Sequence, residues 1–447
     1  MTELLELARK IAGRADGRGE QVEAFVARGR STSVKVHGGE VESLTQAASA
    51  GVGVRVVREG RQGFAWAASL DDTVVAEVLA EARDNMTFAE PDEWVGLAEP
   101  DGVEPPAIDL WRDGLDDLST EDKVTLALEL EAAVLAGDPR IAGVRTASWG
   151  DGIGEGGVAT STGIEAWGRS TGCHMAVSAL AEADGETQTG YGVSVGREPT
   201  EIDLHEAARD AVDRATRLLG ARQPDSGLVT LVLEPRLSAI VLGIVSGMLS
   251  GEAVLKGRSP FAERMGEAIA SPLLHLVDDP TDPESLAADT HDGEGLATRR
   301  IPLIDDGVLR GFLHNTYTGR RSGTASTASA VRGYRSTPGV GAQALALRPG
   351  SGTLDELLAQ VDHGILVQSM TGLHSGVNPI SGDFSVGVEG LLIRNGKRAE
   401  PVREATVAST IQRLLLDVRA VGGDREWTPG GTASSTLVID NVTLSGT

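Results

Sequence analysis

The stretch HSGVNPISGDFSVGVEG, residues 374–390, contains side chains of the types that catalyse hydrolysis or hold a substrate. His374 and Asp383 could form an acid–base pair, and Ser385 could serve as a nucleophile. The sequence around Ser385 does not have the nucleophile-elbow pattern, however. Its composition instead favours a sharply bent entry into a strand, in which polar side chains fix the turns and Phe384 fills a core between two glycines.

A second candidate set lies in THDGEGLATRR, where His291, Asp292 and Glu294 occur close together. Imidazole and carboxylate groups at this spacing could bind a metal ion or act as an acid–base set. The surrounding glycines and the strand-like residues that follow favour a polar loop. The sequence alone leaves both interpretations open.

Three other motif fragments lack the features that would complete them. His205 begins an HExxH pattern, but Arg209 stands where the second imidazole is required. The glycines of GDGIGEGG, residues 150–157, match GxGxxG, but strand-like residues rather than a helix follow them, so a turn is predicted here. Cys173 and His174 are neighbours in a strand-like stretch and would point to opposite faces, so Cys173 is interpreted as a small core residue.

The composition restricts the class of protein. Asp and Glu number 65 against 40 Lys and Arg, and the resulting net charge of -25 would repel the phosphates of nucleic acids. The single cysteine excludes an intramolecular disulfide, and no apolar run is long enough to span a membrane. The N-terminal residues predict an amphipathic helix rather than a signal peptide. We therefore expect a soluble, cytoplasmic protein that binds neither nucleic acid nor membranes directly.

The N-terminal part, residues 1–222, is predicted to be an α+β domain in which helices pack on an antiparallel sheet. Alternating apolar residues over 22–69 predict a meander of four or five strands. Ser119 begins a capping-box pattern at a helix start, and Asp184-Gly185 predicts a hairpin. The other predicted elements are helices at 4–11, 71–87 and 201–219 and a connecting segment at 89–118.

The stretch ARQPDSG, residues 221–227, marks the predicted boundary to a β-rich second domain, residues 223–447. Asp306-Gly307 and Asn395-Gly396 predict hairpins with type I′ turns. Because strands dominate this part, we expect a barrel-like, strongly curved sheet and an α+β fold class for the whole chain. The other predicted elements are a buried strand at 228–234 and helices at 237–249, 353–360 and 405–416.

Four stretches of the second domain occur in a characteristic order: SGEAVLKGRSPFAERMGEAIASPLLHLVDDP, DGEGLATRRIPLIDDGVLRGFLHNTYTGRR, GVNPISGDFSVGVEGLLIRNGKRAEPV and a terminal LVIDNVTLSG. In this order they resemble the TldD/PmbA family of peptidase-related proteins, once described as modulators of DNA gyrase. The resemblance covers about residues 225–447 strongly. It covers the first part mainly through the order of helices and strands.

The resemblance implies two branches that act together. The TldD branch carries a zinc-binding HExxxH helix and a further Cys ligand in a glycine-rich loop, whereas the TldE (PmbA) branch lacks both. Here Leu242, Gly243 and Gly247 occupy the HExxxH positions, and none of them has a ligand atom. No two of the eight histidines are five residues apart, independently of any family. The chain therefore resembles the TldE type, with no catalytic or metal-binding residue of its own.

The resemblance further implies a non-catalytic subunit of a heterodimeric zinc peptidase. A TldD-type partner would carry the zinc, and the pair would act on small or unfolded peptides, for example in the processing of peptide precursors. The expected signature residues, which would shape a wall of the substrate chamber, are His374, Gly376, Asn378, Gly382, Asp383 and Phe384.

Two alternatives stay open from the sequence. The chain could be a self-sufficient hydrolase without zinc, using His291, Asp292 and Glu294, or His374 with Asp383. It could also be a binding or scaffold protein without a peptidase partner. A homodimer of the isolated chain is compatible with all of these functions.

Overall fold

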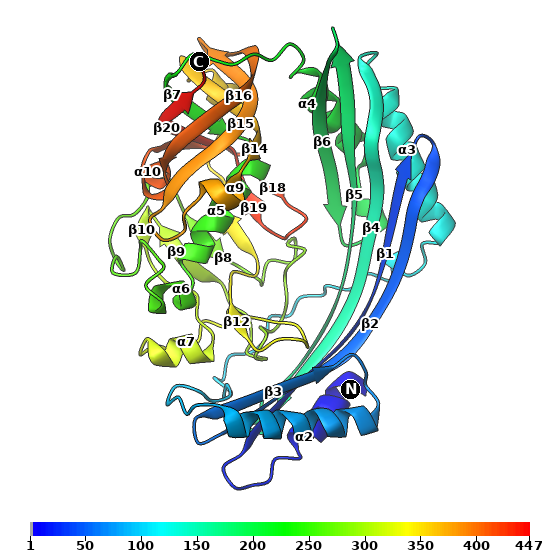
Figure 1. Cartoon of the computed structure of the whole chain (residues 1–447), viewed down its shortest axis with the longest axis vertical. Helices are drawn as coiled ribbons and strands as arrows, with labels where there is room; N and C mark the ends of the chain where they lie inside the picture. Colours follow the sequence, from blue (N-terminus) through cyan, green and yellow to red (C-terminus); the bar gives the residue numbers. More distant parts are fainter. Residues whose placement is uncertain (1–2) are drawn as a thin grey trace.

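The N-terminal half is built on one long antiparallel sheet (Figure 1). The computed structural model describes residues 3–447 and gives the strand order β3–β2–β1–β4–β5–β6. Four of these strands are 17 to 20 residues long, and the sheet curves along their length. The strands are β1 (Gln21–His37), β2 (Glu40–Arg58), β3 (Arg61–Ala67), β4 (Ile141–Thr160), β5 (Glu165–Ala183) and β6 (Glu186–Gly196).

Two pairs of helices cover the two ends of this sheet and form two separate apolar cores. One pair packs mainly against β1, β2, β3 and β4, and the other packs mainly against β1, β4, β5 and β6. Ser119 caps its helix as predicted, because its side chain accepts the N–H of Asp122. The helices are α1 (Glu3–Ala12) and α2 (Asp72–Phe88) at one end, and α3 (Thr120–Leu135) and α4 (Leu204–Thr216) at the other.

Glycines on β6 let α4 lie directly on the sheet. A Cβ atom on Gly192 would be 1.9 Å from the carbonyl oxygen of Ala207, and one on Gly190 would be 2.0 Å from that of Ala211. No side chain fits in either place, so the short distance between helix and sheet depends on these two residues.

The C-terminal half contains a closed five-stranded barrel, which confirms the predicted curved sheet and the α+β class. Its strand order is β16–β15–β14–β7–β20, and pairing between β16 and β20 closes it. The largest apolar core of the described chain fills the barrel and the space beneath it. The strands are β7 (Gly227–Leu233), β14 (His363–Thr371), β15 (Asp383–Arg394), β16 (Lys397–Thr410) and β20 (Leu437–Ser445), with β17 (Val418–Val421) added to β20.

A second sheet lies beside the barrel, in the order β10–β9–β8–β13–β19–β18. Its strands are β8 (Leu276–Asp278), β9 (Ile301–Asp305), β10 (Val308–Leu309), β13 (Leu345–Leu347), β18 (Glu426–Trp427) and β19 (Ala433–Ser434), and β11 (Ala330–Val331) pairs separately with β12 (Gly339–Val340). The helices of this half are α5 (Pro235–Met248), α6 (Gly251–Leu255), α7 (Thr316–Arg321), α8 (Leu354–Leu358), α9 (Leu373–Gly376) and α10 (Ile411–Leu416). Among the helices of residues 3–447, none has the length and apolar character required to cross a bilayer.

Some predicted elements were wrong in extent. The meander over 22–69 contains three strands, because β1 and β2 continue through the glycines that were taken as breaks. GDGIGEGG is not a turn but the middle of β4, since β1 and β5 pair with it on both sides. The last predicted helix begins at Ile411, because residues 405–410 belong to β16. Pairing with neighbours outweighed the local preference of glycine in the first two cases.

Buried charges join the two halves of the molecule. Glu23 on β1 accepts two hydrogen bonds from Arg55 on β2, at 3.0 and 2.7 Å. Two loop residues of the C-terminal half complete the group: Arg332 pairs with Glu23, and Glu294 lies 3.5 Å from Arg55. All four side chains are at most 5% exposed. We call these four residues the interdomain charge cluster.

Replacing Gly192 by Ala tests the contact between α4 and the sheet. The added methyl group must displace α4, so we expect Gly192→Ala to lower the free energy of unfolding by about 1–3 kcal/mol. Gly143→Ala on β4 is the matched control, because a Cβ at Gly143 meets no atom within 4 Å. Urea unfolding monitored by circular dichroism measures both variants. Equal midpoints for the two variants would contradict this interpretation.

The interdomain charge cluster predicts a large effect of Glu23→Gln. Among residues 3–447, the variant removes the only ion-pair partner of the buried Arg332 and leaves Arg55 with Glu294 alone, and we expect it to cost about 3–5 kcal/mol of unfolding free energy. The exposed Glu400, which pairs with Arg394, offers the control Glu400→Gln, and its unfolding midpoint should stay nearly unchanged.

The carboxylate of Glu23 also predicts how the stability of the protein changes with pH. Burial would raise the pKa of Glu23, but Arg55 and Arg332 outweigh it and hold the pKa below the ordinary value of 4.5. The ion pairs therefore contribute their full stability above pH 4.5, and this contribution is lost as the pH falls through the lowered pKa. Unfolding measured from pH 6 down to pH 3 should show this loss in the natural protein, and a smaller one in Glu23→Gln.

Candidate functional site

Helix α5 buries one face and exposes the other. Leu237, Val241, Leu242 and Val245 point into the large C-terminal core. On the opposite face Gly243 and Gly247 are exposed, and a Cβ on either would meet only open space. At the three positions where a zinc helix would carry HExxxH, the chain thus offers one core leucine, 1% exposed, and two glycines without side chains.

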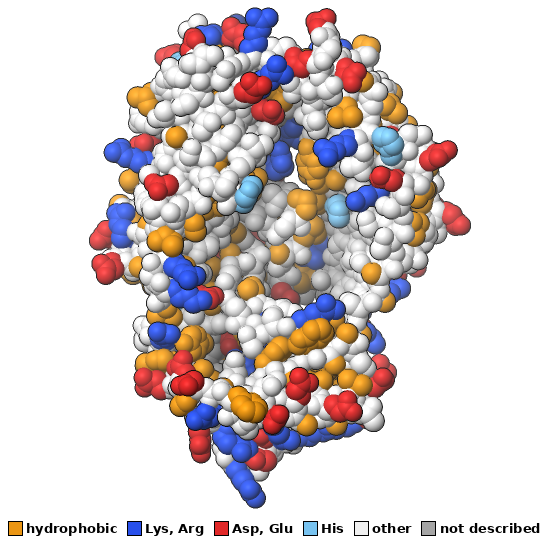
Figure 2. Space-filling model, viewed as in Figure 1, with side chains coloured by type: hydrophobic (Ala, Val, Ile, Leu, Met, Phe, Trp, Pro, Cys, Tyr) orange, Lys and Arg blue, Asp and Glu red, His pale blue; other side chains and the backbone are white. Residues whose placement is uncertain are grey.

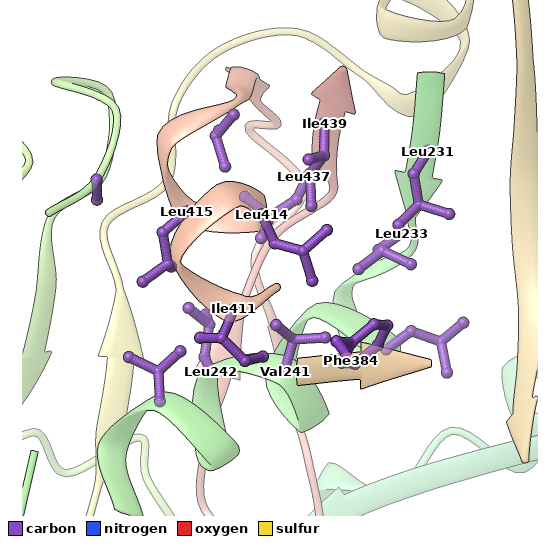
Figure 3. Close-up of a cluster of buried hydrophobic side chains, with 14 of the residues drawn as sticks. Leu231, Leu233, Val241, Leu242, Phe384, Ile411, Leu414, Leu415, Leu437 and Ile439 are labelled. Atoms are coloured by element: carbon purple, nitrogen blue, oxygen red, sulfur yellow. The ribbon is translucent and has the colours of Figure 1, made fainter. Parts of the chain in front are cut away.

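The stretch 374–390 is anchored against α5 by Phe384, the first apolar residue of β15. Phe384 is 2% exposed and lies in the same core as Val241 and Leu242 of α5 and Ile411 of α10 (Figure 3). A sequence prediction is thereby confirmed, because Phe384 does fill a core.

The polar residues of this loop are used to fix its turns. The Asn378 side-chain oxygen accepts the N–H of Ile380 at 2.9 Å, and the Asn378 N–H donates to the carbonyl oxygen of Asp383 at 2.9 Å. The Asp383 carboxylate accepts the Ser381 hydroxyl at 2.6 Å. Gly382 adopts a φ of 84°, which is unfavourable for residues with a side chain. His374 lies exposed in α9.

Gly376 is required for the loop to close on β15. A Cβ at this position would be 1.9 Å from the carbonyl oxygen of Ser385. The neighbouring Val377 forms an isolated β-bridge with Phe384, which keeps the two chain segments at this short distance. The geometry of the signature residues therefore accounts for a shaped wall, and it assigns hydrogen bonds within the loop to Asn378 and Asp383.

The second predicted set, at 291–294, lies in a buried loop of the C-terminal half. One Asp292 oxygen accepts the N–H groups of Glu294 and Leu296, at 2.9 and 3.0 Å, and the other accepts that of Ala330 at 3.0 Å. Glu294 accepts the N–H of Thr316 at 2.8 Å and belongs to the interdomain charge cluster. Burial, with Glu294 nearby, raises the pKa of Asp292 to about 7.

His291 does not join these carboxylates in an acid–base set. Its Nδ1 lies 2.9 Å from the hydroxyl of Thr290. The backbone partners of Asp292 and Glu294 tie loops together, as a polar structural loop requires. This arrangement favours the structural interpretation of the set over the catalytic one.

The remaining motif residues have ordinary surroundings. Cys173 is 1% exposed in the core under α3 and α4, and burial, followed by the charge of Asp151, raises the pKa of its thiol to about 12. His174 points to the other face of β5, as the strand period requires. His205 is exposed in the first turn of α4.

The residues do not fit a zinc site. A catalytic zinc ion takes three protein ligands and keeps one position open for water. Within residues 3–447, no group of three His, Cys, Asp or Glu side chains is placed so that it could hold a metal ion. The α5 positions likewise offer no nitrogen, oxygen or sulfur ligand from a side chain. No step of a reaction is therefore assigned to a metal on this chain.

A large cavity lies between the two halves, and sequence reasoning missed it. Its volume is about 1090 Å³, and Figure 2 shows the molecule hollowed between its halves. Residues of β6 and α4 form one wall, and the start of α5, residues 283–286 and the segment around β18 form the other. Arg236 and Glu426 both line it although 190 positions separate them, so no local pattern could have brought them together.

Domain profiles of one family match most of the chain. They are PmbA/TldA metallopeptidase domain 1 over residues 22–85, the central domain over 113–219 and the C-terminal domain over 226–446. Metalloprotease PmbA of Escherichia coli O157:H7 is 24% identical over 437 residues, which are 97% of this chain and 94% of that protein. The metalloprotease TldD homolog of Haemophilus influenzae is 28% identical over 422 residues, which are 89% of this chain and 87% of that protein.

Solved structures share the fold over nearly the whole length. TldE from Thermococcus kodakarensis superposes with a TM-score of 0.91 at 23% identity and covers 99% of both chains. A putative modulator of DNA gyrase from Bacteroides thetaiotaomicron has a TM-score of 0.87 at 26% identity, with 99% of this chain and 98% of that chain covered. The three domain profiles in their order, together with these full-length relatives, show that the chain belongs to the PmbA/TldD metallopeptidase family.

Proposed function

We propose that this chain is the non-catalytic, TldE (PmbA)-type subunit of a heterodimeric zinc peptidase. The observation that supports this most strongly is the exposed face of α5, which presents Gly243 and Gly247 at the positions of the expected zinc helix. A TldD-type partner of the same architecture would hold the zinc. Bound there, zinc would supply a water molecule of lowered pKa for peptide hydrolysis.

The role of this chain in the pair is to form part of the substrate chamber. The exposed glycines of α5 leave room beside the helix, and Phe384 anchors the 374–390 loop in the core under the same helix. A folded protein is too large for the interdomain cavity of about 1090 Å³, whereas a short or unfolded peptide is not. These dimensions support a pair that acts on small or unfolded peptides.

The outer edge of β2 is the surface on which we propose that the partner docks. β3 pairs with β2 only over residues 52–58, and no strand of residues 3–447 pairs with the edge over 40–50. Residues 40–49 are exposed on both faces of the sheet. Val41 and Leu44 are 45% and 42% exposed, which is unusual for apolar side chains of an unprotected edge.

A TldD-type chain fits this edge better than a second copy of this chain. A strand added to an open edge gains main-chain hydrogen bonds, and the apolar side chains add affinity. Two copies would bring together two net charges of -25, which repel each other. We therefore assign the edge to the zinc-bearing partner.

The proposed function predicts a defined composition of the native complex. The tagged chain, purified from its own host, should appear in native mass spectrometry as a heterodimer of near-equal halves with one zinc ion. Peptide hydrolysis should require both chains and should be lost on chelation. The chain alone should be inactive, and His291→Ala or His374→Ala in the pair should retain activity. Hydrolysis by the isolated chain at the rate of the pair would overturn the proposal.

The docking surface predicts a selective loss of assembly in Leu44→Asp. A buried, unpaired carboxylate at the interface should weaken partner binding at least about tenfold, since each tenfold change needs only ~1.4 kcal/mol. Leu273, which is 48% exposed in the C-terminal half, provides the control Leu273→Asp. Surface plasmon resonance with the immobilised partner measures both. Unchanged affinity of Leu44→Asp would place the partner elsewhere.

A further inference from the structure

The interdomain cavity contains a guanidinium group without a carboxylate partner. Arg236 is the second residue of α5, and one of its amino groups donates to the carbonyl oxygen of Gln368 at 3.3 Å. Its guanidinium lies 5.4 Å from the centre of the Tyr191 ring. Among the described residues, no carboxylate lies within ion-pair distance of Arg236. The nearby Glu234 is already bound by Arg214 and Arg217.

The same cavity contains a carboxylate without a cationic partner. Glu426 on β18 lines the cavity and has no hydrogen bond or ion pair to any side chain of residues 3–447. Two cations near it are bound elsewhere, since Arg425 pairs with Asp282 and Arg214 pairs with Asp210, and Arg236 faces it without forming an ion pair. The Glu426 side chain is exposed to the cavity. The surrounding walls nevertheless desolvate its carboxyl group, which raises the pKa of Glu426 to about 7.

A strand edge forms part of the wall of the same cavity. β6 is the last strand of its sheet, and Val193 and Val195 of β6 line the cavity. The carbonyl oxygen of Tyr191 accepts a hydrogen bond from Arg214, so the backbone groups of Tyr191 point away from β5. In an antiparallel strand, every second residue points its N–H and C=O groups to the same side. The N–H and C=O groups of Val193 and Val195 therefore face away from β5, where an extended main chain could pair with them.

We propose that this cavity binds a short peptide with both termini free, holding its carboxylate at Arg236 and its ammonium group at Glu426. A guanidinium binds a carboxylate through two parallel hydrogen bonds, and an ionised glutamate complements an ammonium group. The edge of β6 supplies main-chain partners for the residues between the termini. The peptide identity of the ligand rests on the proposed function, which this inference deepens by naming the substrate or product class.

The cavity volume is consistent with this ligand. Pockets of roughly 300–1,000 Å³ hold ligands of drug size, and the cavity of about 1090 Å³ is slightly larger than that range. A peptide of a few residues fits such a volume. A long unfolded chain would have at most one terminus inside, so the paired charges select short peptides.

Isothermal titration calorimetry of the full chain, without its partner, tests the inference. The probe is tetra-alanine, compared with its N-acetylated, C-amidated and doubly blocked forms. We expect the free peptide to bind, and each single block to weaken binding by about tenfold or more. These comparisons use only the natural protein, so they stay informative if a variant fails to fold.

Two variants assign the termini to the two charges. Arg236→Gln should bind free and C-amidated peptide equally, and Glu426→Gln should bind free and N-acetylated peptide equally. Arg419→Gln is the matched control, because Arg419 is exposed, pairs with Asp440 and does not line the cavity. Its affinities should match those of the natural chain.

The pH dependence gives a further readout. Glu426 faces Asp210 and Arg214 of α4, Glu234 and Arg236 at the start of α5, and Asp424 of its own segment. Because the ionised carboxylate binds the ammonium group, affinity should rise as the pH passes about 7. It should fall again above roughly 8, where the peptide amine loses its proton. Glu426→Gln should lack the rise.

The outcomes separate this inference from the proposed function. Absence of binding at millimolar tetra-alanine, or equal affinity of free and doubly blocked peptide, overturns the inference and leaves the heterodimer possible. In that case the inference stays overturned even if the heterodimer is active. Conversely, binding by the isolated chain with both terminal preferences supports the site even if no zinc-bearing partner is found.

Discussion

The interdomain charge cluster sets the arrangement on which the rest of the structure depends. Glu23 receives two guanidinium groups, one from its own sheet and one from a loop of the other half. Burying four charges is costly, and the pairs recover that cost only in one relative position of the halves. The cluster therefore contributes more to a single orientation than to net stability. The cluster thereby fixes where the β1–β2 part of the sheet meets the C-terminal half.

The path of the 374–390 loop follows from packing rather than from reactive groups. Phe384 and Leu242 share one core, so the glycine-rich loop and the exposed face of α5 keep a fixed relation. Gly376 and Gly382 allow the tight path of the loop, and Asn378 fixes its turn. A family scaffold can thus be preserved in full while the positions of its zinc helix contain leucine and glycine. This combination supports a subunit that shapes a site.

Elements formed by interactions between residues close in sequence were predicted correctly, and those formed by distant residues were not. The hairpins at Asp184-Gly185, Asp306-Gly307 and Asn395-Gly396 were correct, because positive φ at both turn residues is a local demand. The long strands were divided wrongly at glycines, since pairing from both sides was invisible in one strand's sequence. Phe384 was correctly placed in a core. Arg236 and Glu426 were missed, because only the folded chain brings them to one cavity.

The glycine tract of β4 has a mechanical consequence. Residues 150–157 lie between two helix-covered cores, and the five glycines among them contribute no side chains to packing in this part of the sheet. Elastic bending of the sheet should therefore concentrate there, with the helix-covered ends moving as stiff arms. The arm that contains α4 and β6 is one wall of the cavity. Thermal flexing of a single sheet would then move this wall without unfolding either core.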